Sequence, residues 1–336
     1  MFSAMSGETR YIAGNIPDPK SRKYTCPTCE EEVSHVSETR RSLNIIVSEH
    51  FRHKAGDAKH PHKRFTWQVG NMMSYLIGNF SGNTGLDQFF DVETERRYSA
   101  SMEGKNLDFV VDMLATEKGL NQRKTAIIVE SDEFNANELL SQMHLLSSQG
   151  IYTMLVLSAK GTANPSGKYF RPEFRRHTGE TVRKIPGNEK AVYELFGERN
   201  IYFDHDTQSL MAVKFNDYSE EHDERQLSTG HVLEAGTQEF GTKKRPETLG
   251  RFKAFGFEYK RTSPGGLLIA RPAPIVDYYL DLEKRAEAKH DDDLSETVGE
   301  RIGIMLDSMS QGERARLTGK YGAEKLGGYA VAGQSS

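Results

Sequence analysis

Between residues 60 and 158 the chain passes from a helical apolar pattern to short strand-like runs, and this order constrains the fold more than any other feature. Three β-prone runs, at residues 89–92, 106–114 and 125–130, are each bounded by turn residues. A helix with Asn135 as its N-cap and a buried strand over residues 151–157 follow them. The helix that precedes them carries apolar residues at Phe65, Val69, Met72, Met73, Leu76 and Ile77. The order helix, three strands, helix, strand predicts a mixed α/β (α+β) sheet with helices packed on it, its last strand lying beside the third.

Length and composition place the chain among ordinary globular proteins. The 336 residues correspond to roughly two domains of about 100–200 residues each. Hydrophobic residues make up 36% and charged residues 27%, which excludes collagen-like and fully disordered classes. A formal net charge of -4 argues against a uniformly basic nucleic-acid coat. The sequence has neither an apolar run of about 20 residues nor a signal-peptide pattern, so we expect a cytoplasmic protein without a membrane span.

The chain has two cysteines, and both lie in one short motif, Cys26-Pro-Thr-Cys29. No disulfide framework can therefore hold this fold together. His50 and His53 follow in the segment His-Phe-Arg-His. Two thiolates and two imidazoles are the four ligands that a structural zinc ion takes, and the close spacing of the histidines resembles a zinc ribbon more than a DNA-reading finger. The sequence predicts a zinc site formed by Cys26, Cys29, His50 and His53.

Two other interpretations of the cysteine motif stay open. The histidines could be incidental to a lone Cys-x-x-Cys, or the motif could serve thiol redox chemistry. Redox motifs of this kind lie between a strand and a helix. The acidic run at residues 30–32 would also raise the thiol pKa, which disfavours a reactive thiolate.

A second candidate site consists of carboxylates on neighbouring strands. Asp108 lies inside the second expected strand and Glu130 closes the third. Oxygen ligands so placed favour Mg²⁺ or Mn²⁺. Such an ion could orient a water molecule and neutralise charge on a scissile phosphate. The plainer interpretation, in which both carboxylates are simply solvated, remains open on the residues alone.

This arrangement resembles the PD-(D/E)XK nuclease core. Together with the segments Tyr24-Thr-Cys-Pro-Thr-Cys29 and His50-Phe-Arg-His53, it resembles the competence protein CoiA-like family over residues 10–160. Members of that family join a zinc-finger-like N-terminal module to a nuclease-like domain. Further matches are Glu93 with Arg96-Arg97, and Gly150-Ile-Tyr152 before the last strand.

The resemblance implies a role for particular residues. The strand aspartate of the family falls on Asp108, the strand-end glutamate on Glu130, and the histidine and lysine of the first helix near His60 and Lys63. One departure from the family is a third carboxylate, Asp132, where related nucleases have lysine or glutamine. Water activation would then depend on the metal alone or on Lys63.

A second departure lies before the strand aspartate, where residues 105–107 read Lys-Asn-Leu and the arginine often found in the family is missing.

Basic residues gather between Arg40 and Arg64, where seven stand against two acids, with four histidines beside them. A local positive field of this kind suits a phosphate backbone. The candidate nucleic-acid contacts are Arg52, Lys54, Lys63, Arg64, Arg96 and Arg97. A second basic cluster, residues 168–190, contains aromatic residues that could stack on unpaired bases. Each run could also be a solvated face.

These patterns divide the chain into five regions. They are a zinc-finger-like module (10–55), a nuclease-like core (56–160), a basic mixed extension (161–270), C-terminal helices (271–327) and a flexible tail (328–336). Helical spacing of Val298, Ile302, Met305, Leu306 and Met309 indicates packing against the body or a protein partner. His205 and Asp206 are expected to be surface residues of a turn.

The sequence thus favours a Mg²⁺- or Mn²⁺-dependent nuclease that hydrolyses DNA phosphodiester bonds during DNA processing, uptake or recombination. Its predicted catalytic residues are Asp108, Glu130, Lys63, His60 and Asp132. The alternative is a catalytically degenerate nuclease-fold protein that binds nucleic acid or acts as an adaptor. Asp132 is the feature that favours this alternative.

Overall fold

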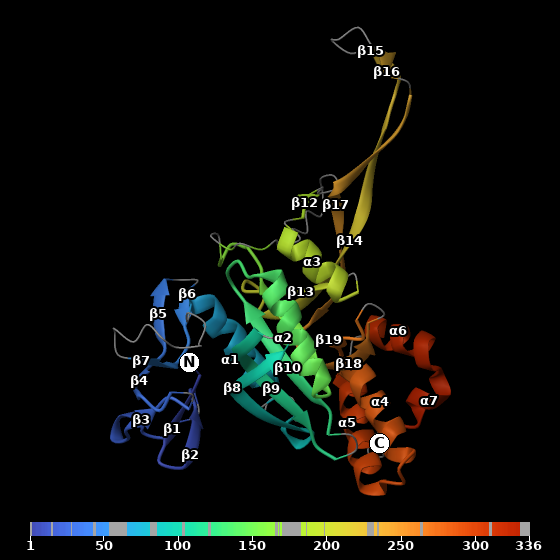
Figure 1. Ribbon diagram of the computed structural model, residues 1–336. Helices are drawn as coiled ribbons and strands as arrows, with labels where there is room; N and C mark the ends of the chain where they lie inside the picture. The colour runs from blue at the N-terminus through green and yellow to red at the C-terminus, as the bar shows by residue number, and fades with distance from the viewer. Residues whose placement is uncertain are drawn as a thin grey trace.

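Figure 1 shows a small β-module at the N-terminus, a central sheet with helices on its faces, and a group of C-terminal helices. The computed structural model describes residues 2–14, 16–27, 29–42, 45–53, 66–80, 86–102, 105–119, 122–164, 167, 169, 183–185, 187–197, 199–226, 232–233, 235–262, 265–308 and 311–329. The mixed α/β fold class expected from the sequence is confirmed.

The N-terminal module is built on a five-stranded sheet of order β2-β1-β3-β4-β7. Its strands are β1 (Ser3–Ser6), β2 (Thr9–Ile12), β3 (Tyr24–Thr25), β4 (Glu32–Val36) and β7 (His50–His53), and a short 3₁₀ helix covers Pro19–Ser21. Within the described part of the chain, the strands β5 (Thr39–Ser42) and β6 (Ile45–Val47) pair with each other and not with this sheet. The buried cluster of the module consists of Ala4, Tyr24, Cys26, Val33 and Phe51. A core of this size needs a further stabiliser, such as a metal ion or contact with the body.

The next elements follow the expected order. They are α1 (Trp67–Phe80), a 3₁₀ turn (Leu86–Gln88), β8 (Phe90–Met102), β9 (Lys105–Glu117), β10 (Lys124–Glu130), α2 (Ala136–Ser148) and β11 (Ile151–Ser158). Strands β8, β9 and β10 form an antiparallel ladder, whereas β10 and β11 pair in parallel across the α2 connection. The side chain of Asn135 accepts from the N–H groups of Asn137 and Glu138, so the predicted N-cap of α2 is confirmed.

The two helices cover opposite faces of this sheet. The α1 side chains pack in one cluster with Ile127 and Val129 of β10, and the α2 side chains pack with Ile128 on the other face. Because successive residues of a strand point to opposite faces, β10 is apolar on both sides. Five consecutive residues of β10, from Thr125 to Val129, are buried. Strand β11 is buried in the same way, and its one half-buried residue is Tyr152.

The chain beyond residue 160 continues the same sheet. It adds β12 (Arg183–Lys184), α3 (Gly187–Leu195), β13 (Asn200–Asp204), β14 (Ser209–His222), β17 (Gly236–Phe252), β18 (Phe255–Arg261) and β19 (Leu268–Pro274). Among the described residues the sheet has ten strands in the order β12-β17-β14-β13-β11-β10-β9-β8, with β19 beside β11 and β18 beside β19. The turn expected at His205 and Asp206 joins the antiparallel strands β13 and β14.

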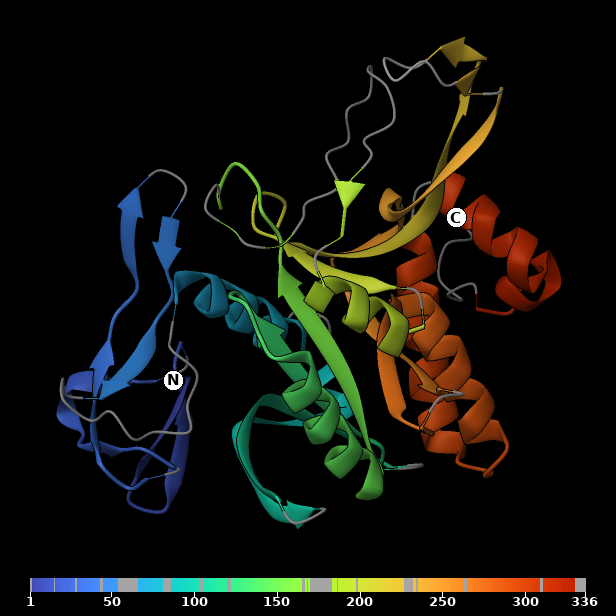
Figure 2. The same ribbon diagram turned by 45° about the horizontal axis from the view of Figure 1, so that its top comes forward.

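Strands β14 and β17 extend beyond the body as a two-stranded ribbon (Figures 1 and 2). Its end carries the short pair β15 (Arg225–Gln226) and β16 (Val232–Leu233). Val213 and Phe215 anchor the inner part of the ribbon in the cluster that includes α3. Because a two-stranded ribbon is marginally stable alone, the packing of Val213 and Phe215 stabilises the ribbon against the body.

The C-terminal helices are α4 (Ile275–Glu287), α5 (Asp292–Ser308), α6 (Gln311–Tyr321) and α7 (Ala323–Gly327). Val298, Ile302 and Leu306 of the helical stripe are buried in the main core cluster, so the stripe packs against the body. Met309 lies outside the described residues. None of the helices in the described part of the chain is both long and apolar enough to span a membrane.

A substitution at Gly256 of β18 can test how tightly α4 packs on the sheet. A Cβ at this position would overlap the Tyr278 side chain of α4, which is 1% exposed. We therefore expect Gly256→Ala to lower the free energy of unfolding by about 1–3 kcal/mol through overpacking, measured by urea denaturation.

Gly319→Ala on α6 is the matched control, because nothing lies within 4 Å of the added Cβ. This change should raise stability by up to about 1 kcal/mol through helix propensity. Equal effects of the two substitutions would contradict the close packing of β18 on α4.

Candidate functional site

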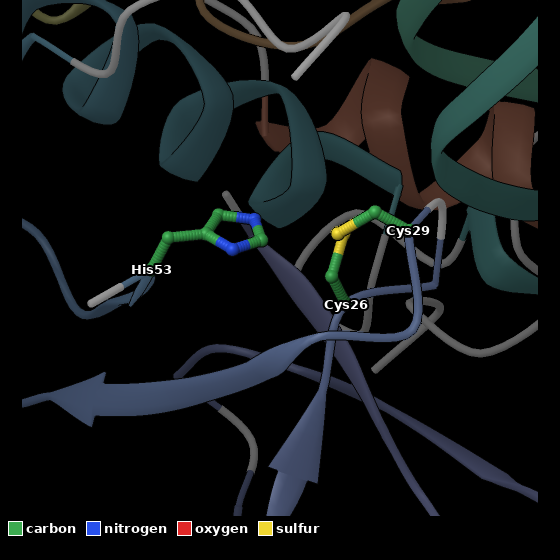
Figure 3. A group of neighbouring side chains, drawn as sticks. All are labelled: Cys26, Cys29 and His53. Atoms are coloured by element: carbon green, nitrogen blue, oxygen red, sulfur yellow. The ribbon is translucent and has the colours of Figure 1, made fainter. Parts of the chain in front are cut away.

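Cys26, Cys29 and His53 form the one group of three or more potential ligands that the described residues contain. Their ligand atoms all lie within 4.8 Å of one another. Figure 3 shows the His53 ring pointing toward the two cysteine side chains. Cys26 follows β3, Cys29 lies in the turn before β4, and His53 ends β7. Two thiols and an imidazole at this separation could hold a metal ion.

The fourth predicted ligand, His50, does not join this group, which corrects the sequence prediction. His50 and His53 lie three residues apart on β7, so the alternation of a strand points their side chains to opposite faces. The buried His50 ring has its Nδ1 atom 2.8 Å from the carbonyl oxygen of Ser48. Burial also lowers the pKa of His50. The sequence prediction used the number and spacing of the histidines alone, and the alternation of the strand directs His50 away from the other three side chains.

The surroundings of the cysteines do not favour thiol redox chemistry. The motif lies between two strands, β3 and β4, and not at the N-terminus of a helix. Burial raises the pKa of Cys29 to about 11, opposed by a hydrogen bond from the backbone of Glu31. A thiol with this pKa is a poor nucleophile, whereas a bound cation would favour its thiolate form.

The structure places Asp108 on an exposed part of β9. Its two oxygens accept hydrogen bonds from the Arg97 guanidinium of β8, at 2.7 Å each. This bidentate contact lowers the pKa of Asp108. The pairing of β9 with β10 ends at the Met113–Ile127 pair, five residues from Asp108. The Asp108 side chain is thus engaged with β8, on the far side from β10.

Asp112, which the sequence prediction passed over, lies where β9 and β10 separate. Its carboxylate is buried, at 9% exposure, and Oδ2 accepts a hydrogen bond from the backbone N–H of Val129 at 2.9 Å. Val129 directly precedes Glu130, so Asp112 is the β9 carboxylate that lies beside the end of β10. A signal was present in the sequence: Asp112 interrupts an apolar run, and a buried carboxylate is costly unless it has a partner or a task.

Strand β8 has an irregular backbone at Glu95, the residue opposite Asp112. Glu95 lies between the pairs Thr94–Met113 and Arg96–Val111, and its φ of 57° is in the left-handed region. Its carboxylate accepts hydrogen bonds from the backbone N–H and the hydroxyl of Ser3 in β1. The N-terminal module is therefore attached to the sheet at the strand position that faces Asp112.

Acidic residues lie at the end of β10 and directly after it. Glu130 pairs with Leu157 of β11, and the carbonyl oxygen of Asp132 accepts a hydrogen bond from the Tyr169 hydroxyl. The pKa of Tyr169 is raised by burial, and the charges of Glu130 and Asp132 add to the effect. The Asp132 side chain is exposed. The two cationic candidates for this place, His60 and Lys63, lie outside the described residues.

A buried polar network follows the carboxyl ends of the parallel strands β10, β11 and β13. The Oγ of Ser158 lies 2.8 Å from Nε2 of His205, and the Asn164 amide donates to the same hydroxyl. Thr66, which precedes α1, lies 3.1 Å from the Ser131 hydroxyl. Open sheets with parallel strands bind ligands at this edge.

The expectation that His205 is a surface residue is wrong. Its side chain is 6% exposed and packs against the rings of Trp67 and Phe203. Burial lowers the pKa of His205 to about 4, so the ring is neutral at pH 7.

The predicted nucleic-acid contacts are partly described. Arg52 is exposed on β7, Arg96 pairs with Glu93 at 2.8 Å, and Arg97 pairs with Asp108. The exposed Arg96–Glu93 pair has a single contact and is weak, so Arg96 can exchange partners, whereas Arg97 is held by two hydrogen bonds to Asp108. The remaining candidates, Lys54, Lys63 and Arg64, lie outside the described residues.

Comparisons with family models, with curated proteins and with solved structures give no match for this chain.

The buried His205 predicts a specific pH dependence of stability. Its pKa is about 4 in the folded chain and 6.5 when unperturbed. Below about pH 6.5 the unfolded chain therefore binds a proton that the folded chain does not, and the free energy of unfolding falls by about 1.4 kcal/mol per pH unit until about pH 4. The variant His205→Gln should lack this contribution.

The measurement is urea denaturation of both proteins at several pH values between 7 and about 4.5. The stability of the wild type relative to His205→Gln should decline as the pH falls, while contributions from other groups cancel. Parallel stability curves would contradict a buried neutral histidine.

Proposed function

We propose that this chain is a metal-dependent nuclease that hydrolyses DNA phosphodiester bonds, with a structural zinc ion in its N-terminal module. One observation carries the proposal: the carboxylate of Asp112 reaches the backbone of β10 one residue before Glu130, at the open end of the β9–β10 ladder. The helix, three strands, helix, strand order around it is the order that resembles the PD-(D/E)XK core.

Asp112 and Glu130 would hold a Mg²⁺ or Mn²⁺ ion, since carboxylate oxygens are the ligands that these ions prefer. The ion would supply Lewis-acid chemistry at a phosphate. The chain contributes rigid placement: the Val129 N–H group orients Asp112, and Glu130 closes a strand that is buried on both faces. Asp108, the original candidate, is the weaker choice because Arg97 engages both of its oxygens.

For the N-terminal module, zinc is the metal that best matches two thiolates and one imidazole. Ion binding there would stabilise a small module with few buried apolar residues.

The proposed partner is DNA, contacted through exposed arginines that include Arg52 and Arg96. A protein partner on the C-terminal helices remains a prediction from the sequence. A cytoplasmic location and a role in DNA processing, uptake or recombination remain predictions from the sequence.

The second candidate function is DNA binding without hydrolysis. Asp132 favours it, because a carboxylate stands two residues after Glu130 where a cation would help to stabilise a developing negative charge. Under this alternative the protein would keep the fold and the zinc module and would act as a binding module or adaptor.

The experiment compares the wild type with three isosteric variants on labelled single- and double-stranded DNA in Mg²⁺ or Mn²⁺. Asp112→Asn and Glu130→Gln should each lower the cleavage rate at least about 100-fold, because each removes a charged ligand of the ion. Asp108→Asn is the matched control on the same strand and should stay within about threefold of the wild type.

The outcomes separate the candidate functions. Cleavage that persists in both Asp112→Asn and Glu130→Gln would overturn the nuclease proposal. DNA binding without any cleavage by the wild type would instead select the non-catalytic alternative. Loss of cleavage in Asp108→Asn and Glu130→Gln, with cleavage kept in Asp112→Asn, would return the metal site to the original pair, Asp108 and Glu130.

A further inference from the structure

We propose that Glu31 is the fourth ligand of the metal centre formed by Cys26, Cys29 and His53. This inference rests on the zinc assignment proposed above and concerns the same centre. It does not depend on nuclease activity. Structural zinc sites take four protein ligands, and the strand geometry that excludes His50 leaves one position to fill.

The strand register places Glu31 on the face that holds the other ligands. In the β3–β4 pair, Tyr24 lies opposite Val33 and Thr25 opposite Glu32. The next position brings Cys26 opposite Glu31, and the backbone N–H of Cys26 donates to the Glu31 carbonyl oxygen at 2.8 Å. Residues directly opposite in an antiparallel pair share a face, with Cβ atoms about 5 Å apart.

The same register relates Glu31 to His53. In the β4–β7 pair, His53 lies opposite Val33. Glu31 stands two residues before Val33, so it lies on the same face and is the diagonal neighbour of His53. Cys26 and His53 thus flank the position of Glu31 from the two neighbouring strands.

The side chains agree with this placement. Oε2 of Glu31 lies 3.9 Å from Nδ1 of His53. Two ligand atoms on one tetrahedral zinc ion, each about 2.0–2.2 Å from the metal, are roughly 3.3–3.5 Å apart. The Glu31 side chain is 48% exposed. Its carboxylate lies beside His53 of the Cys26, Cys29 and His53 group, and a rotation toward the two sulfur atoms would complete the ligand set.

The backbone conformation of the turn before β4 brings Glu31 opposite Cys26. Glu30 has a φ of 63°, in the left-handed region that residues other than glycine rarely adopt, and its N–H donates to the Cys26 carbonyl oxygen at 2.9 Å. This conformation returns the chain so that Glu31 pairs with Cys26. The backbone of Glu31 also hydrogen-bonds the Cys29 thiol. Both cysteines therefore contact the residue that we assign as the fourth ligand.

The test uses Co²⁺ as a spectroscopic substitute for zinc in the full chain after removal of metal by a chelator. Tetrahedral Co²⁺ absorbs visible light strongly, and the band position depends on the ligand set. We expect Glu31→Gln to lower the affinity for Co²⁺ and for Zn²⁺ at least about tenfold and to shift the Co²⁺ bands.

The matched control is Glu32→Gln. Glu32 is the neighbouring glutamate, lies opposite Thr25 and points to the other face of β4. This variant should keep the affinity and the Co²⁺ spectrum of the wild type. His53→Gln should weaken binding at least as much as Glu31→Gln does.

The outcomes distinguish this inference from the zinc assignment. Tight binding by the wild type with no change in Glu31→Gln would overturn the role of Glu31 and leave the zinc assignment intact. Absence of binding by the wild type, or binding unaffected by Cys26→Ser, would overturn both. An equal shift in Glu31→Gln and Glu32→Gln would mean that the loss of a nearby negative charge causes it, and not the loss of a ligand. This result would also overturn the assignment of Glu31.

Discussion

Burial of β10 and β11 on both faces is the constraint on which the rest of the structure depends. With α1 on one side and α2 on the other, these strands have no solvated face on which to carry polar side chains. Apart from Thr125 and Thr153, which are buried inside the strands, the polar residues of this region lie where the strands end. Glu130, Ser131, Ser158 and His205 all follow or close a parallel strand. A site at this edge is a direct consequence of the apolar strands behind it.

The second constraint is the break in the antiparallel half of the sheet. The Asp112 side chain accepts a hydrogen bond from the backbone N–H of Val129, at the point where the pairing of β9 and β10 ends. Glu95, in the facing position on β8, has a left-handed backbone and binds Ser3 of the N-terminal module. The proposed catalytic carboxylates and the metal-binding module are therefore fixed through neighbouring positions of the same ladder.

The direction in which each side chain points explains why some residues of the candidate sites were predictable from the sequence and others were not. Cys26, Cys29 and His53 were predictable from their chemistry and from their short separations in the sequence. His50 failed because residue spacing was used without the period of the element that carries it, and a strand reverses the side-chain direction at each residue. Asp108 and Asp112 lie four residues apart on one strand, and no local rule distinguishes them. Their partners, Arg97 and Val129, belong to different neighbouring strands.

The sequence by itself determined the kinds and the order of the elements, because apolar period, turn residues and caps such as Asn135 act within a few residues of the chain. It also determined that β11 is buried, since its residues are apolar without alternation. Only the tertiary structure decided which carboxylate of β9 reaches the backbone of β10 beside Glu130, that His205 is buried, and that residues beyond 160 complete the same sheet. These features depend on register between segments far apart in the chain, and register is set by packing that local sequence does not encode.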